Sequence, residues 1–136
     1  MEGIEKLLSK IQSIKTKIDN AIYRVVVETT LQVEADAKKS MKGGASGKYH
    51  SSPGEPPYVQ TGNLRNNVVI ELPKLIEGQE ITGKVGVRDS VRYAPALEFG
   101  YPGRNLEERP FLRPALVRNM SKFKDNLKDA VAGVTK

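Results

Sequence analysis

Cysteine and tryptophan are missing from this sequence of 136 residues, and histidine occurs only once. Without cysteine the chain forms neither a disulfide nor a thiolate metal site, which favours an intracellular origin. A zinc site needs several nitrogen, sulfur or oxygen ligands, whereas His50 stands alone in a Gly/Ser/Pro-rich segment that suits solvent exposure. The sequence therefore predicts no metal site and no cofactor.

Long apolar runs are missing as well. No stretch approaches the roughly 18 consecutive apolar residues that a membrane-spanning helix needs. The first residues, MEGIEK, lack the basic and apolar regions of a signal peptide. We therefore expect one globular, soluble domain over residues 1–136, with no membrane partner.

The signatures of common catalytic sites are also lacking. The sequence holds no Gly-rich phosphate loop with GK[ST] and no nucleophile elbow around a serine. The carboxylate pair Glu107 and Glu108 fits a solvated surface better than a nuclease site made of carboxylates alone. We therefore expect a protein that binds rather than one that catalyses a reaction.

Positive charge is in excess, with a formal net charge of +6. The excess lies towards the C-terminus, since residues 101–136 hold eight basic residues against four acidic ones. Such a balance is typical of contact with nucleic acid or with an acidic protein, and also of a solvated face. The basic residues are not interleaved with the aromatic residues that stack on single-stranded bases. A basic nucleic-acid-binding protein therefore remains the alternative to a structural subunit.

Residues 4–41 contain neither glycine nor proline, and their apolar positions follow a helical period. The stripe steps by three and four through Ile4, Leu7, Ile11, Ile14, Ile18, Ala21 and Val25. An unbroken helix would be about 57 Å long, whereas a compact domain of this size is about 37 Å across. Either the helix breaks, near Asp19-Asn20 or in the β-branched run Val25–Thr30, or its stripe continues onto another subunit.

The rest of the chain predicts an α+β fold, with a small antiparallel sheet of three to four strands and a C-terminal helix packed on it. Four segments follow: a helical N-terminus over 1–41, an extended Gly/Ser/Pro loop over 42–65, the sheet over 66–100, and a loop with the last helix over 101–136. Within them we expect strands at 66–72 and 81–88 joined as a hairpin, a segment at 92–99 that suits a strand or a helical turn, and a helix beginning at Pro110.

Three short stretches break the ordinary composition of a domain, namely SSPGEPPYVQTGNLR at 51–65, RYAPALEFG at 92–100 and ERPFLRPAL at 108–116. Their order and spacing resemble the head–tail joining and tail-completion family of tailed bacteriophages. This family is typified by phage Hong Kong 97 and is related to minor tail protein Z of lambda-like phages. One position departs from the pattern, because Tyr101 follows Gly100 where the family commonly has Gly-Thr after Glu-Phe.

The resemblance implies a structural protein of the virion, made in the bacterial host cytoplasm and placed at the neck of a phage or prophage. There it would form a homo-oligomeric ring, hexameric to suit tail symmetry, that completes the tail and joins it to the DNA-filled head. Its partners would be neighbouring neck and tail proteins, with weak, sequence-independent DNA contact in the channel. Tail terminator and head-side adaptor are rival roles, and a tail-like bacteriocin is a rival source.

The motif residues are the candidates for subunit contacts. They are Pro53, Gly54, Pro56, Pro57, Tyr58, Thr61, Gly62, Leu64, Arg65, Tyr93, Ala94, Glu98, Phe99, Gly100, Arg109, Pro110, Phe111 and Pro114. For Phe111 the residues favour an ordinary place in the core. The loop over 43–60 is long and polar, so we expect a neighbouring subunit to order it.

Glu98 lies between Leu97 and Phe99 and beside small residues that allow close packing. A carboxylate in such a place needs a basic partner. The candidates are arginines, which bind a carboxylate with two donors, at Arg65, Arg92 or Arg109. The alternative is a solvated edge residue.

Overall fold

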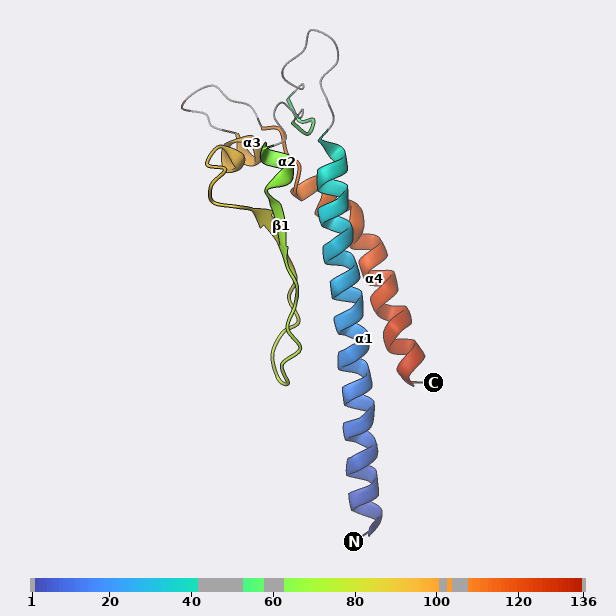
Figure 1. Ribbon diagram of the computed structural model, residues 1–136. Coiled ribbons are helices and arrows are strands. Elements are labelled where there is room, and N and C mark those ends of the chain that lie inside the picture. The colour runs from blue at the N-terminus through green and yellow to red at the C-terminus, as the bar shows by residue number, and fades with distance from the viewer. Residues whose placement is uncertain (1, 42–52, 58–62, 101–102, 104–107, 136) are drawn as a thin grey trace.

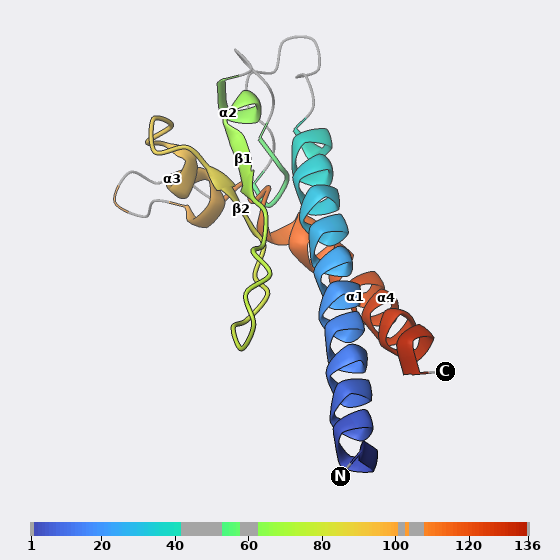
Figure 2. The same ribbon diagram turned by 60° about the horizontal axis from the view of Figure 1, so that its bottom comes forward.

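The computed structural model describes residues 2–41, 53–57, 63–100, 103 and 108–135. These form two long helices, two short helices and a hairpin, arranged as Figures 1 and 2 show. The elements in chain order are α1 (Glu2–Ser40), α2 (Asn63–Asn66), β1 (Val68–Glu71), β2 (Lys84–Val87), α3 (Ala94–Phe99) and α4 (Arg113–Thr135).

Helix α1 is continuous, so the break considered near Val25–Thr30 does not occur. The β-branched residues there lie in the part of the helix that packs against the rest of the chain, and Val25, Val26 and Thr30 are buried. Packing of an apolar face outweighs weak intrinsic helix propensity. Residues 2–17 are all exposed and project beyond the other elements in Figure 1. We call residues 2–17 the stem.

Strands β1 and β2 form an antiparallel hairpin, as the sequence predicts, with Val68 opposite Val87 and Glu71 opposite Lys84. The expectation of three to four strands is wrong for the residues that the structure describes, where the sheet has two. The ambiguous segment at 92–99 contains helix α3 instead of a strand. Pro95 explains this choice, because proline fits the first turn of a helix but cannot donate to a strand ladder.

Helix α4 packs along α1, rather than on the sheet as expected. It begins at Arg113, a few residues after the predicted start at Pro110. Ala115 of α4 meets Val33 and Ala37 of α1 in one buried cluster. A second cluster joins the end of α1 to the hairpin, α3 and the segment before α4, through Met41, Leu64, Val68, Val91, Ala94 and Phe111.

Gly83, just before β2, lies close to Thr30 of α1. A Cβ atom placed on Gly83 would overlap the hydroxyl oxygen of Thr30. That hydroxyl is buried and donates to the carbonyl of Val26 at 2.7 Å. Only glycine therefore allows this approach of the two backbones.

We expect Gly83→Ala to lower the free energy of unfolding by about 1–3 kcal/mol, the usual cost of overpacking a filled site. Gly86→Ala is the matched control in the same hairpin, because a Cβ there meets nothing within 4 Å. Urea denaturation of the two variants gives the comparison. Equal midpoints for both would contradict the close approach.

Candidate functional site

The three sequence motifs come together at the base of α4. The N–H of Gly54, in the first motif, donates to the carbonyl of Glu108 at 2.9 Å. The N–H of Arg109 donates to the carbonyl of Leu97, in the second motif, at 2.6 Å. The third motif thus forms backbone hydrogen bonds with both of the others.

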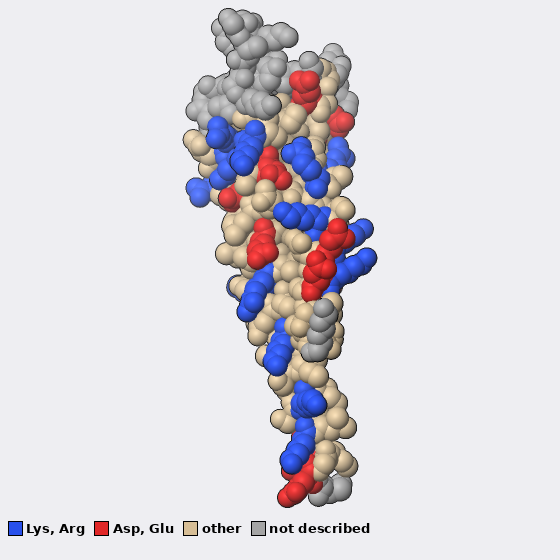
Figure 3. Space-filling model, turned by 90° about the vertical axis from the view of Figure 1, so that its right-hand side faces the viewer, with Lys and Arg blue, Asp and Glu red and all other residues tan. Residues whose placement is uncertain are grey.

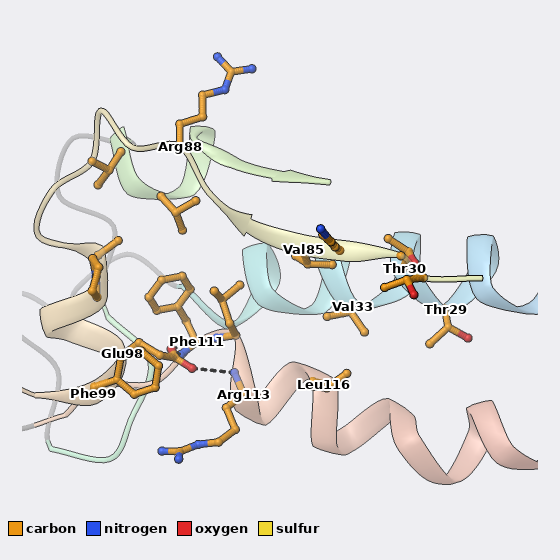
Figure 4. Close-up of a pocket in the computed structure, with 18 of the residues that line it drawn as sticks. Thr29, Thr30, Val33, Val85, Arg88, Glu98, Phe99, Phe111, Arg113 and Leu116 are labelled. Carbon is orange, nitrogen blue, oxygen red and sulfur yellow. Dashed lines mark hydrogen bonds between the residues drawn. The ribbon is translucent and has the colours of Figure 1, made fainter. Parts of the chain in front are cut away.

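Glu98 stabilises the N-terminus of α4. One carboxylate oxygen, Oε2, accepts hydrogen bonds from the N–H groups of Phe111 at 2.7 Å and Leu112 at 3.1 Å. The other oxygen, Oε1, accepts from the N–H of Arg113 at 2.7 Å (Figure 4). A helix N-terminus exposes N–H groups with no partner inside the helix and carries partial positive charge, so it binds a carboxylate well.

The local sequence explains why this cap comes from elsewhere in the chain. Leu112 precedes the first helical residue, and its carbonyl accepts the N–H of Leu116 at 3.0 Å. Serine, threonine, asparagine or aspartate usually occupies that position and caps the helix with its own side chain. Leucine has no such group, and Glu98 supplies the missing acceptor from α3.

The partner of Glu98 is therefore a helix N-terminus and not the arginine that we expected. With 4% of its surface exposed, Glu98 is also not the solvated edge residue of the alternative. Three backbone N–H groups take the place given to Arg65, Arg92 or Arg109. This carboxylate consequently orients α4.

The other motif residues divide by exposure. The buried ones are Pro57, Leu64, Ala94, Pro110 and Phe111, and the half-buried ones are Pro56, Gly100, Arg109 and Pro114. The exposed ones are Pro53, Gly54, Arg65, Tyr93 and Phe99, whereas Tyr58, Thr61 and Gly62 lie outside the described residues, as does most of the loop 43–60. Phe111 is fully buried, as its core interpretation predicts, while Phe99 is 70% exposed.

A groove with a volume of about 970 Å³ runs between α1, β2, α3 and α4. Figure 4 shows its apolar side chains, with Val33, Val85 and Leu116 facing one another from three elements. Arg88 and Arg113 belong to its lining, and their charged ends point away from its apolar part. The groove thus presents an apolar floor with basic groups around it.

The stem carries an exposed apolar stripe. Its side chains are between 38% and 60% exposed, although they follow the same helical period as the buried part of α1: Ile4, Leu7, Leu8, Ile11 and Ile14. Contiguous exposed apolar surface of this kind is typical of a site that binds another protein, a membrane or a ligand. Because α1 is unbroken, the alternative of a broken helix is wrong, and the stripe of the stem lies exposed on the single chain.

Charge on the face that shows the two long helices is of mixed sign. Figure 3 shows lysine and arginine side chains alternating with acidic ones on the upper part of this face. Further basic side chains are spaced down the narrow lower part, the stem. A continuous basic band, the usual footprint of a nucleic-acid site, is not seen among the described residues on this face.

Sequence reasoning did not identify the polar link between the two long helices. The amide of Asn119, which is buried, donates to Asp36 Oδ2 at 2.7 Å and to the carbonyl of Ala115 at 2.7 Å. Gln32 donates to the other oxygen of Asp36 at 2.9 Å. The pKa of Asp36 lies below its usual value, chiefly because of the hydrogen bond from Asn119.

The lowered pKa of Asp36 predicts that the free energy of unfolding depends on pH. Because the pKa of Asp36 is lower in the folded than in the unfolded chain, its contribution to stability is complete above the unfolded value, near pH 4, and is lost as pH falls through the folded value. Asp36→Asn should therefore weaken the chain at pH 7 and have less effect at pH 3. In an Asn119→Ala background the pH-dependent part should largely vanish. The test is the free energy of unfolding across pH 3–7 for the wild type, the two single variants and the double variant. A pH dependence in Asp36→Asn that equals that of the wild type would contradict the link between the helices.

The described residues were also compared with the requirements for a membrane span and for a metal site. None of their helices is both long and apolar enough to cross a bilayer. They also contain no group of three or more His, Cys, Asp or Glu side chains placed to hold a metal ion.

The comparison with protein families matches residues 5–100 to the HK97-gp10-like family, described as "Bacteriophage HK97-gp10, putative tail-component". The match covers more than half of the chain, and the chain belongs to this family. It includes α1 from residue 5 onward and the first two sequence motifs, whereas the third motif, at 108–116, lies beyond it. Neither the curated proteins nor the solved structures give a match. The family places the protein among the structural components of a phage tail.

Proposed function

We propose that the chain is a non-enzymatic subunit that assembles with its own copies into a ring at the phage neck. This ring would complete the end of the tail and join it to the DNA-filled head, with residues 1–136 acting as one assembly domain. The observation that carries the proposal is the stripe of the stem, which the described residues of its own chain leave largely exposed. Membership of a tail-component family gives the setting in which such a surface meets other copies.

The distribution of apolar surface supports a ring over a two-fold pair. The stem stripe lies at one end of the molecule, whereas Phe99 and the groove lie beside the far part of α1. Different apolar surfaces at separate places on one chain suit a heterologous interface, in which unlike surfaces of two copies meet. Repetition of such a contact closes into a ring when the rotation between neighbours allows it.

The motif residues would take two roles in this assembly. The buried ones, such as Leu64 and Phe111, build the core that fixes the base of α4. The exposed ones, such as Arg65 and Phe99, would face another subunit or a neighbouring neck protein. The binding surface thus rests on a rigid base, and the mechanism is binding without turnover.

The mass of the purified protein at several concentrations tests the ring. We expect a single closed assembly, with six copies to match tail symmetry, in equilibrium with monomer. Images of tail preparations that carry a labelled copy would locate it, and would separate tail completion from the tail-terminator and head-side adaptor roles. A chain that stays monomeric at every concentration contradicts the ring.

The net charge of +6 favours a second candidate, direct binding of nucleic acid. The mixed charges of Figure 3 support weak, sequence-independent contact instead, as a DNA channel requires. We expect low affinity that falls steeply with salt, since each neutralised phosphate adds to the slope. Binding measured with several DNA sequences distinguishes the two functions. Tight, sequence-selective binding at physiological salt would contradict the ring and favour the nucleic-acid-binding alternative.

A further inference from the structure

The hairpin ends in a second exposed apolar surface. Residues 71–80, which we call the arm, begin at the last residue of β1 and include the turn that leads back towards β2. Its apolar side chains are 43–46% exposed, namely Leu72, Leu75 and Ile76. Figures 1 and 2 both show the end of the hairpin lying well short of the N-terminal end of α1. The arm of a chain therefore leaves most of its own stem uncovered.

Stem and arm are opposite in charge. The stem holds four lysines against two glutamates, and the arm holds three glutamates against one lysine. Where the arm of the chain approaches its own α1, Lys15 Nζ and Glu77 Oε1 form an ion pair at 3.1 Å. Both side chains are largely exposed, so this pair adds little stability. It shows, however, the chemistry by which an arm recognises this helix.

The two surfaces also agree in length. The stripe from Ile4 to Ile14 extends about 15 Å along the helix at 1.5 Å per residue. The apolar side of the arm, from Leu72 to Ile76, extends about 13 Å if each residue of extended chain contributes about 3.3 Å. One arm thus covers one stripe.

Pairing of two stems through the same stripe is less favourable. In the heptad defined by Ile4 and Leu7, the positions that flank the seam hold Lys10 and Lys17 on one edge and Lys15 on the other. A parallel pair would bring Lys10 near Lys15 of the other helix, and an antiparallel pair would bring Lys10 near Lys17. Glu2 and Glu5 lie on the outer face and do not compensate these charges.

We infer that the stem of one copy binds the arm of the next, with the apolar stripe against Leu72, Leu75 and Ile76 and the stem lysines against the arm glutamates. The occupant of the stem is thus a second copy of this chain. The contact is head-to-tail, because each copy gives its arm to one neighbour and its stem to the other. It rests on the proposed ring and supplies its repeating interface.

Two double variants test this contact. The stem variant is Leu7→Ser with Ile11→Ser, and the arm variant is Leu75→Ser with Ile76→Ser. All four side chains are exposed, so both variants should keep the circular dichroism of the wild type. Leu31→Ser, which changes an exposed leucine of α1 outside the stem, is the control. Each double variant alone should need at least a tenfold higher concentration to assemble than the wild type or the control.

An equal mixture of the two variants gives the sharpest result. In a head-to-tail contact only one interface stays intact. It joins the unaltered arm of the stem variant to the unaltered stem of the arm variant. Sedimentation should therefore show dimers of one copy of each and nothing larger. Since the chain has no cysteine, Ile11→Cys in one chain and Ile76→Cys in another should also join as a disulfide-linked pair when mixed.

The outcomes separate this inference from the proposed function. A wild type that assembles while both double variants assemble equally well overturns the stem–arm contact and leaves the ring standing. If the arm variant assembles like the wild type while the stem variant stays monomeric, the stem–arm contact is also overturned. Pairing of two stems would then be favoured. A wild type that never assembles overturns the ring and the contact together.

Discussion

Phe111→Ala is expected to remove about 3–5 kcal/mol from the free energy of unfolding, the usual cost of a large cavity in a core. Phe111 has no exposed surface and lies in the cluster that joins α1, the hairpin and α3. The total free energy of unfolding of a small domain is about 5–15 kcal/mol. We therefore expect the variant to be partly or wholly unfolded at 37 °C, as circular dichroism and urea titration would show. Phe111→Leu, which keeps more of the volume, should lose about 1–2 kcal/mol and remain folded.

Phe99→Ala is the matched control, because the same change is made at a side chain that is 70% exposed. Its free energy of unfolding should stay within about 0.5 kcal/mol of the wild type, as for ordinary surface substitutions. If Phe99 anchors a neighbouring subunit, the variant should instead assemble only at higher concentration. A loss of stability equal to that of Phe111→Ala would show that Phe99 belongs to the core of the monomer.

The long elements of the fold follow directly from the sequence. The stripe that begins at Ile4 and the absence of glycine and proline up to residue 41 predict α1, and the alternation in 81–88 predicts β2. Periodicity alone does not say what covers a stripe. The same spacing of apolar residues runs through exposed Ile11 and buried Val25, and only the position of the other elements distinguishes them.

The segment at 92–99 suits a strand or a helical turn, and Pro95 at the first helical turn decides between them. Other features depend on where distant parts of the chain meet. The direction in which α4 packs depends on Ala115, which is small enough to approach α1 closely. The partner of Glu98 depends on a chain reversal that brings α3 to the base of α4, and no local pattern encodes it.

The second large loss of stability is expected for Glu98→Gln, because Glu98 accepts hydrogen bonds at the start of α4. Both carboxylate oxygens accept from backbone N–H groups, Oε2 from Phe111 and Leu112 and Oε1 from Arg113. Glutamine has one oxygen and one NH₂ group, so in either orientation an NH₂ must face a backbone N–H donor. The variant also loses the negative charge that favours a helix N-terminus. We expect a loss of about 2 kcal/mol, since hydrogen bonds to charged groups contribute about 1.5–3 kcal/mol.

Glu98→Ala should cost more, about 3 kcal/mol or above, because it leaves N–H groups at the start of α4 without an acceptor and one of them is buried. Glu108→Gln is the matched control in the third motif. Its carboxylate is about half exposed and meets Arg113 at 3.4 Å, an ion pair of little net value. Urea denaturation at one protein concentration should therefore rank the chains as wild type and Glu108→Gln together, then Glu98→Gln, then Glu98→Ala. Equal midpoints for the two glutamine variants would show that the negative charge of Glu98 does not hold α4 in place.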